Sequence, residues 1–427
     1  MVERRERAHR ARGSAGRETA AAASAATRAS ASTRAGRDAL TIEHIVAVES
    51  PREFRLHPRE RLVAYTAEAA GARQVFSLPL RGGFPRQLTA SEEAVSDPQW
   101  SPDGRRIAFV RKDAIWTMEA DGSRLTRVTE HPAGTSRPRW SPDGRQLAFV
   151  SRRRGWSQVW LIDAPVPRRG RPAAHPRPPE PRVVTPAGLD VEEFDWSPDG
   201  SRLAAFARAA DDLFGSITVV DVAPGGEARR IGTGNWESGG RWLPDGSLLF
   251  VSDADGWFQV VRLSADGQDR VVLTSGEREH GEPSGGFGFA PLPSPDGTRF
   301  TFPEVYDGFM DLLVAPIAGR RPRRGRGRPP GDPVVAAGGR GRPIQPWSGL
   351  WRAVDWTADG AWVLAIGESE ARPQDLWLLP VPDVAPAGAA ARQVTDSLPA
   401  VLRPAFTAGV AGERIAFPAR DGLRIEG

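Results

Sequence analysis

Short apolar segments, each bounded by turn residues, recur along most of the chain. In the clearest repeat, a segment ending at Trp100 is followed by Ser-Pro-Asp-Gly at 101–104 and by apolar segments at 106–110, 114–118 and 125–129. Pro presets φ at the first central position of a turn, and Gly tolerates the positive φ at its exit. The pattern therefore predicts four antiparallel strands and no helix in each repeat.

The repeat returns with similar spacing through the chain. Its copies start at residues 56, 100, 140, 196, 242, 293 and 356, and the first copy is eroded. Four-stranded units of roughly 40–50 residues are typical of propeller blades. The Asp-Gly turns would interrupt the helices of a helical solenoid. The sequence therefore predicts an all-β fold, a seven-bladed β-propeller of four-stranded antiparallel blades.

We interpret the repeated residues as scaffold, because a Trp before a turn is expected to pack between blades. Burial of roughly 200 Å² of indole contributes on the order of 5 kcal/mol as an upper bound. A turn glycine contributes nearer ~1 kcal/mol. The structural residues of the repeats are Trp100, Asp103, Gly104, Trp140, Asp143, Gly144, Trp196, Asp199, Gly200, Trp242, Asp245, Gly246, Asp296, Gly297, Trp356, Asp359 and Gly360.

Outside the repeats, residues 1–39 are rich in Ala, Ser, Thr and Arg, and we expect them to be a disordered tail before a propeller at 40–400. They lack the continuous apolar core of a signal peptide. Proline- and arginine-rich insertions at 165–181 and 319–333, and a Pro/Ala stretch at 380–391, are expected to be surface loops.

The amino-acid composition argues against several kinds of site and partner. The chain has no cysteine, which excludes disulfides and thiolate metal sites and fits a cytoplasmic location. It has no apolar run of about 18 residues that would span a membrane. The net charge of +4 is modest, and arginines cluster at 152–154, 168–177 and 320–328. No aromatic residue is interleaved in the last two clusters, which argues against a nucleic-acid partner.

A search for chemistry finds no catalytic apparatus. The chain has no Gly-x-Ser-x-Gly elbow, and no two of its six histidines have metal-ligand spacing. Glu277 and Glu279 beside His280 could perform acid–base work only in a pocket, and we interpret them as a solvated loop between blades. We therefore expect no catalytic residue, cofactor or metal, and the substrate-binding residues stay unassigned.

Several stretches resemble a known family. The repeats resemble those of TolB-type propellers and of the propeller of prolyl-oligopeptidase-family serine peptidases. Gly-Gly-Phe-Pro-Arg-Gln-Leu-Thr at 82–89 and Phe-Val-Ser-Asp-Ala-Asp-Gly-Trp at 250–257 are similar to acylaminoacyl-peptidase-like members. So is Glu-His-Gly-Glu-Pro at 279–283. The end of the chain, at 413–427, resembles the join where these peptidases leave the propeller.

The resemblance implies that 401–427 are a linker and first strand leading into an α/β-hydrolase domain that this sequence does not contain. In the family that domain holds a Ser-Asp-His triad and hydrolyses short peptides or acyl-peptides. The chain is then expected to be a substrate-gating propeller, non-catalytic on its own, whose partners are a hydrolase domain or a peptide. The alternative is a stand-alone TolB-like propeller that acts as a protein-interaction scaffold, for which Gly-Trp-x-Gln hairpins at 155–158 and 256–259 are candidate platforms.

Overall fold

A computed structural model gives the fold, and it describes part of the 427 residues. The described residues are 51–165, 180–233, 236–254, 256–276, 278–280, 290–306, 309–317, 334–335, 341–398, 403, 416–418 and 424–426. The expected tail at 1–39 and the arginine clusters at 168–177 and 320–328 lie outside them. The chain divides into two compact units, and the larger comprises Ser50–Ser369, Gln374–Asp396 and Arg414–Gly427.

Among the described residues, the strands of the repeats form seven successive groups of four antiparallel strands. Group 1 holds β1 (Arg52–Leu56), β2 (Leu62–Ala69), β3 (Ala72–Pro79) and β4 (Arg86–Gln87). Group 2 holds β5 (Val95–Trp100), β6 (Arg106–Arg111), β7 (Ala114–Glu119) and β8 (Thr126–Arg127). Group 3 holds β9 (Ser136–Trp140), β10 (Gln146–Ser151), β11 (Gln158–Asp163) and β12 (Arg182–Val183). Group 4 holds β13 (Leu189–Trp196), β14 (Arg202–Ala209), β15 (Ser216–Asp221) and β16 (Ala228–Arg230).

The later groups follow the same plan. Group 5 holds β17 (Glu237–Trp242), β18 (Leu248–Ser252), β19 (Gln259–Leu263) and β20 (Arg270–Val272). Group 6 holds β21 (Leu292–Pro293), β22 (Arg299–Tyr306), β23 (Phe309–Pro316) and β25 (Arg342–Pro343). Group 7 holds β26 (Leu350–Trp356), β27 (Trp362–Ser369), β28 (Arg372–Pro380) and β29 (Arg392–Gln393). These sheets confirm the predicted all-β fold of repeated four-stranded antiparallel units.

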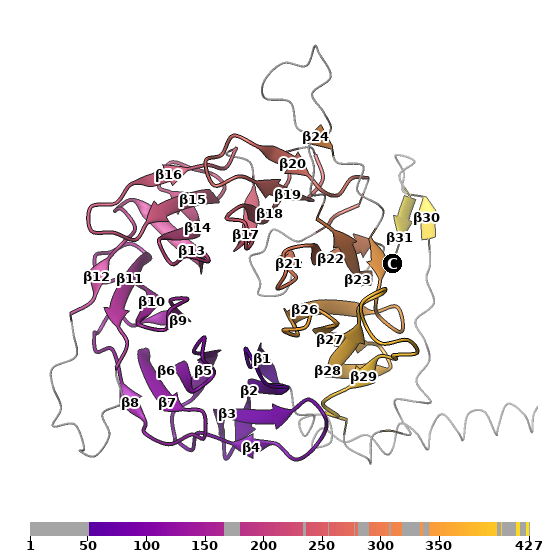
Figure 1. The fold of residues 1–427 in the computed structure, drawn as a ribbon, viewed down its shortest axis with the longest axis horizontal. Helices are drawn as coiled ribbons and strands as arrows, with labels where there is room; N and C mark the ends of the chain where they lie inside the picture. Colours follow the sequence, from indigo (N-terminus) through magenta and orange to yellow (C-terminus); the bar gives the residue numbers. More distant parts are fainter. Residues whose placement is uncertain are drawn as a thin grey trace, which may run out of the picture. The chain divides into compact units, whose positions relative to one another are not determined.

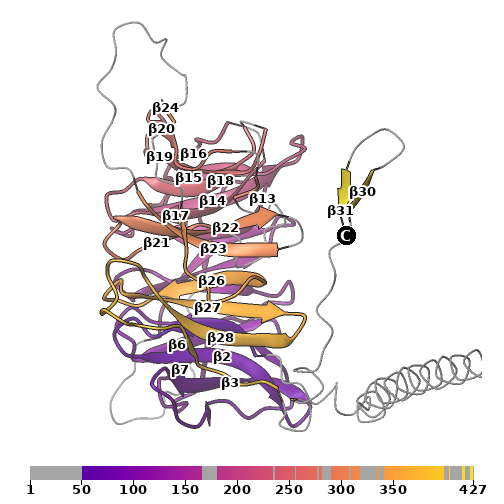
Figure 2. The ribbon, with the colours of Figure 1, turned by 90° about the vertical axis from the view of Figure 1, so that its right-hand side faces the viewer.

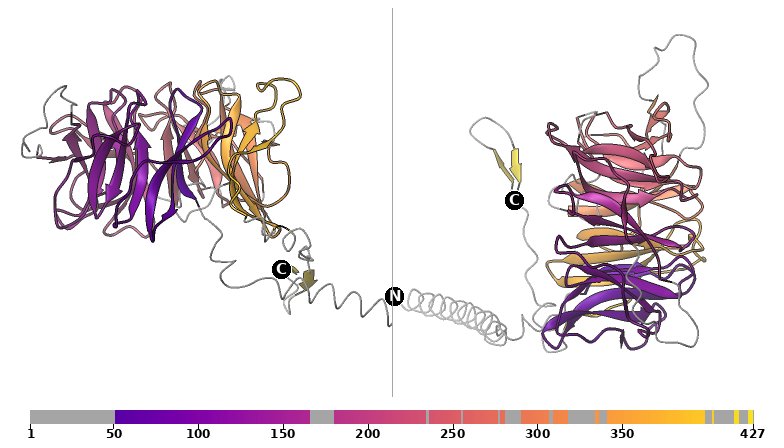
Figure 3. Two further views of the ribbon diagram at one scale, coloured as in Figure 1. Left: turned by 90° about the horizontal axis from the view of Figure 1, so that it is seen from below. Right: turned by 90° about the vertical axis from the view of Figure 1, so that its left-hand side faces the viewer.

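The groups are arranged around a common centre (Figure 1). The first strand of each group lies toward the centre, and the fourth lies at the outside. In the side views, most strands run from one side of the ring to the other (Figures 2 and 3). The groups carry apolar residues on both faces of their sheets. These faces pack against the adjacent groups in successive buried clusters.

Groups 7 and 1 close the ring. Leu364 and Leu376 of group 7 belong to the same buried cluster as Val63 and Leu78 of group 1. At the edge of this contact, Arg392 Nη2 donates to the Leu80 carbonyl at 2.7 Å. The first and last repeats therefore bury each other's apolar faces, which removes the two exposed ends of the array.

Three features go beyond the repeat. Strand β24 (Val334–Val335) pairs in parallel with β20 and adds a fifth strand to group 5. Groups 6 and 7 are joined through one parallel pair, Met310 with Leu350. Strands β30 (Ala416–Pro418) and β31 (Arg424–Glu426) form a separate antiparallel hairpin.

Candidate functional site

The repeated Trp side chains connect each group to the one before it. Five of the indole N–H groups donate to a backbone carbonyl on the first strand of the preceding group. These bonds run from Trp100 to Arg55 at 3.0 Å, Trp140 to Gln99 at 3.1 Å, Trp196 to Arg139 at 3.4 Å, Trp242 to Asp195 at 3.2 Å and Trp356 to Leu292 at 3.1 Å. In each bond the carbonyl belongs to the residue that precedes the Trp-equivalent position of the preceding group. The Trp therefore fixes the innermost strand of its neighbour.

The Asp-Gly turns follow one geometry. Asp143 Oδ1 accepts the Ser141 hydroxyl at 2.6 Å and the Arg145 N–H at 3.0 Å, and Gly144 has a φ of 69°. The hydrogen bonds hold the pKa of Asp143 below its usual value, the Ser141 contact contributing most. Asp103, Asp199, Asp296 and Asp359 accept the corresponding hydroxyl bond from the residue two positions before them. Asp245 instead accepts the hydroxyl of Ser247, two positions after it, because Leu243 stands at the Ser141 position. These carboxylates are engaged in turn structure.

In the eroded first repeat, a histidine replaces the turn carboxylate. His57 Nδ1 accepts the backbone N–H groups of Arg59 at 3.1 Å and Glu60 at 2.8 Å. Its Nε2 lies 3.0 Å from the Gly104 carbonyl, so the tautomer with a proton on Nε2 satisfies all three contacts. The buried ring thereby links the turns of groups 1 and 2.

The residue before the Trp equivalent carries a charge in five of the seven groups. Arg55, Arg139, Asp195, Arg241 and Asp355 each occupy the position before the Trp equivalent, on β1, β9, β13, β17 and β26. Arg139 interacts electrostatically with Arg55, Asp195 and Arg241, which come from three other groups. Charges of both signs therefore gather where the innermost strands face one another, and this region is here called the central channel.

The innermost strands are bulged where they enter this channel. Strand β5 loses register with β6 between Ser96 and Gln99, and similar shifts occur in β1, β9, β13, β17 and β26. Glu53, Asp97 and Arg137 have φ values of 55°, 53° and 55°, which L-residues seldom adopt. A bulge lets two successive inner positions contribute side chains to the channel.

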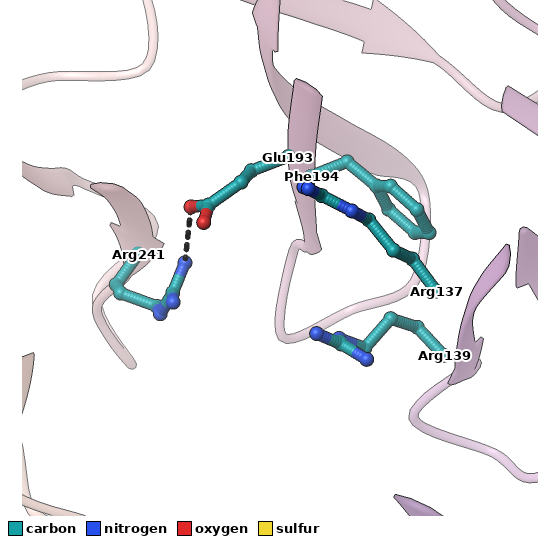
Figure 4. A pocket seen from close by; sticks show the side chains of 5 residues that line it. All are labelled: Arg137, Arg139, Glu193, Phe194 and Arg241. Carbon is teal, nitrogen blue, oxygen red and sulfur yellow. Dashed lines mark ion pairs between the residues drawn. The ribbon is translucent and has the colours of Figure 1, made fainter. Parts of the chain in front are cut away.

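A small pocket within the channel is lined by Arg137, Arg139, Glu193, Phe194 and Arg241. Figure 4 shows Arg137 and Arg139 reaching from one side toward Glu193 and Arg241. Arg241 Nη1 lies 3.9 Å from Glu193 Oε2. The pocket has a volume of about 10 Å³, which is room for one water-sized group.

Burial perturbs the charges of the channel. It lowers the pKa of Arg139 to about 10, and the neighbouring cation Arg55 acts in the same direction. Burial also raises the pKa of Asp355 to about 6, against the opposing effects of the Trp356 N–H and of Arg55. The channel thus contains an acid that titrates close to neutrality and cations held away from bulk water. Such groups can bind the charged ends and amides of a peptide.

The interpretation of Glu279 and His280 as a solvated loop is wrong. His280 is buried, and its Nδ1 lies 2.9 Å from Gln259 Oε1 while its Nε2 lies 3.4 Å from Glu304 Oε1. Burial lowers the pKa of His280. The loop was misread because its partners come from groups 5 and 6, which only the folded ring brings together. Glu277 lies outside the described residues.

In the described part of the chain, no three His, Asp or Glu side chains could together hold a metal ion. No helix there has the length and apolar character needed to cross a membrane. Of the two Trp residues in the Gly-Trp-x-Gln hairpins, Trp156 is half-buried and Trp257 is 42 % exposed.

Comparison with known proteins supports the repeat assignment. Residues 56–168 match the family model of the TolB beta propeller domain. The resemblance of the repeats to TolB-type propellers is therefore confirmed over this segment. No curated protein matches the chain.

Solved structures of two peptidases show the same fold at low sequence identity. A Mycobacterium tuberculosis puromycin-hydrolyzing peptidase is 16% identical over 89% of this chain and 57% of its own, with a TM-score of 0.64. A prolyl endopeptidase is 12% identical over 89% and 54%, with a TM-score of 0.58. A putative TolB from Agrobacterium tumefaciens is 21% identical over 56% and 82%, with a TM-score of 0.42. The chain thus spans little more than half the length of either peptidase.

Proposed function

We propose that this chain is the substrate-gating propeller of a serine peptidase that hydrolyses short peptides or acyl-peptides. In this proposal a separate α/β-hydrolase domain carries the nucleophile, and the propeller covers it. The likeness of nearly the whole chain to the propellers of two peptidases supports the proposal at the level of fold. The observation that carries it furthest is an apolar face on one side of the ring.

The apolar face consists of exposed large side chains on groups 4 to 7. Their exposed fractions are 86% for Leu213, 42% for Phe214, 42% for Trp257, 38% for Phe309 and 40% for Leu350. The first three lie at turns between second and third strands. Phe309 begins the third strand of group 6, and Leu350 begins the first strand of group 7. Since strands alternate in direction, all five lie on the same side of the ring.

The same side is where β1 begins and β29 ends, because a first strand starts and a fourth strand finishes there. Phe214 also stacks on Trp236, with ring centroids 5.3 Å apart, and so extends the apolar surface toward group 5. Exposed apolar side chains gathered on one side of a protein mark an interaction surface. A hydrolase domain covalently continuous with the propeller would bury this face.

The long side chains at the centre of the ring fit a gating role. Arg137, Arg139 and Arg241 line one small pocket there, and their movement would be needed to admit an extended chain. Charged groups of both signs would contact peptide termini during passage. The expected selectivity is for short or unstructured peptides.

The test uses the protein expressed with whatever coding sequence continues after Gly427. We expect hydrolysis of peptide p-nitroanilides that is abolished by a fluorophosphonate. Replacement of Leu213 or Phe309 by Asp should lower the melting temperature of that protein more than that of the propeller alone. Phe84→Asp is the matched control, since Phe84 is 94% exposed on the opposite side of the ring.

If the Asp variants lowered the melting temperatures of both proteins equally, the apolar face would not be the surface that contacts the hydrolase domain. Absence of serine-dependent hydrolysis, with a partner protein captured instead, would favour a TolB-like interaction scaffold.

A further inference from the structure

A second cavity lies between groups 2 and 3, and it shares no residue with the channel pocket. Its volume is about 460 Å³, within the range of small-molecule sites. Arg153 and Arg154, from the turn between β10 and β11, line it together with Trp160 of β11. His131, beyond β8, contributes from group 2, and Glu180 lies at the approach to β12.

The Arg153 guanidinium is held against aromatic rings. Its Cζ lies 5.4 Å from the ring centre of Phe149 and 5.5 Å from that of Trp160. Its Nε and Nη2 are both shielded from solvent and have no hydrogen-bond partner among the described residues. Burial lowers the pKa of Arg153. A half-buried guanidinium with unsatisfied donors carries a desolvation cost that aromatic contact offsets only in part.

A second cation adds to the imbalance. The Cζ of Arg154 also lies 5.5 Å from the Trp160 ring centre, so two guanidinium groups share one indole. Neither Arg153 nor Arg154 forms an ion pair among the described residues. Of the two carboxylates that line the cavity, Glu130 is paired with Arg127 at 3.2 Å and Glu180 is exposed. Neither carboxylate is therefore paired with Arg153 or Arg154 within the described part of the chain.

The sequence that leads to Glu180 contains no further carboxylate. Residues 164–179 include four arginines and no Asp or Glu. An external anion is consequently the partner that would best satisfy the two guanidinium groups.

We infer that this cavity binds a small organic ligand through an oxyanion, a phosphate or a carboxylate. Guanidinium groups bind both through paired N–H donors at fixed geometry. Trp160 and Ile162 supply an apolar wall for the rest of the ligand. The site is independent of the proposed peptidase activity.

The test is calorimetric titration of the complete chain with inorganic phosphate, succinate and phenyl phosphate, at constant ionic strength. We expect binding that is at least tenfold weaker in Arg154→Gln and in Arg153→Met. Arg152→Gln is the matched control, since Arg152 is exposed, does not line the cavity and bonds Ser157 Oγ at 2.9 Å. Arg154 is exposed as well, so its replacement leaves the fold intact even where Arg153→Met does not.

The comparison of ligands separates the two oxyanions. Tighter binding of phenyl phosphate than of succinate identifies a phosphate site, and the reverse order identifies a carboxylate site. Equal weakening by Arg152→Gln and Arg154→Gln would overturn the inference, since it would mean a general attraction of anions to the arginine cluster. Absence of binding of all three anions to the unaltered chain would overturn it as well.

Discussion

Replacement of Trp140 tests the idea that the repeated Trp fixes the neighbouring innermost strand. The side chain is 7% exposed, and it packs among Leu147, Phe149 and other buried residues of groups 2 and 3. Its N–H donates to the Gln99 carbonyl, and the Arg106 guanidinium lies 4.4 Å from the ring centre. Trp140→Ala removes the packing and the bond together, so we expect a loss of about 3–5 kcal/mol.

Two further variants separate the contribution of the indole hydrogen bond from that of packing, and compare both with the contribution of the turn. Trp140→Phe keeps most of the packing but leaves the buried Gln99 carbonyl without its donor, which costs about 1–3 kcal/mol. Gly144→Ala, four residues along, forces an L-residue to a φ of 69° while its Cβ would lie 3.6 Å from Pro102 Cδ. That substitution should cost nearer ~1 kcal/mol.

The assay is urea unfolding of the unaltered chain and the three variants, followed by far-ultraviolet circular dichroism. The expected order of midpoints is Trp140→Ala lowest, then Trp140→Phe, then Gly144→Ala, then the unaltered chain. Equal losses in Trp140→Ala and Gly144→Ala would refute the reasoning, since the Trp would then contribute no more than the turn. A Trp140→Phe midpoint equal to that of the unaltered chain would refute the role of the indole hydrogen bond.

The other predictions use the same unfolding assay or simple kinetics. Gly104→Ala should cost about 2 kcal/mol more than Gly144→Ala, because its Cβ would lie 2.1 Å from His57 Nε2, and equal costs would contradict the close packing of that ring. The folded pKa of Asp355, about 6, is raised above its unfolded value of ~3.9, so its contribution should lower stability as pH rises from about 4 to about 6. Asp355→Asn should therefore stabilise the chain by about 2–3 kcal/mol at pH 8 and by nearly nothing at pH 4, and a gain independent of pH would contradict the reasoning. The chain alone should not hydrolyse chromogenic peptides or esters, and turnover blocked by a fluorophosphonate would contradict this.

The strands and turns were predictable because they depend on local patterns. The segments expected around Trp100 correspond to β5 to β8 within one or two residues. Their signal is the Ser-Pro-Asp-Gly turn between apolar runs, and the turn is stabilised by contacts within five residues.

The channel was not predicted, although its residues leave a trace in the sequence. A charged residue precedes the Trp equivalent at Arg55, Arg139, Asp195, Arg241 and Asp355. Nothing local shows that these side chains point inward, since that direction depends on bulges and on closure of the ring. A search for charge at a fixed offset from the repeated Trp would have found them.

The contacts that bury side chains between neighbouring groups could not be predicted from the sequence either. His280 reads as a loop residue in sequence, yet Gln259 and Glu304 hold it from two different groups. The cavity beside Arg153 likewise combines residues from groups 2 and 3. Contacts of this kind follow from the way the repeats stack rather than from any one repeat.

The proposal that this propeller gates a serine peptidase is tested most directly in cells that express it naturally. The protein is purified through its propeller under native conditions and treated with a biotinylated fluorophosphonate. The proposal predicts a labelled serine on the same polypeptide or on a domain that remains bound to it, together with hydrolysis of short peptide p-nitroanilides. Absence of any labelled serine in the purified material, while other serine hydrolases of the same lysate are labelled, would contradict it.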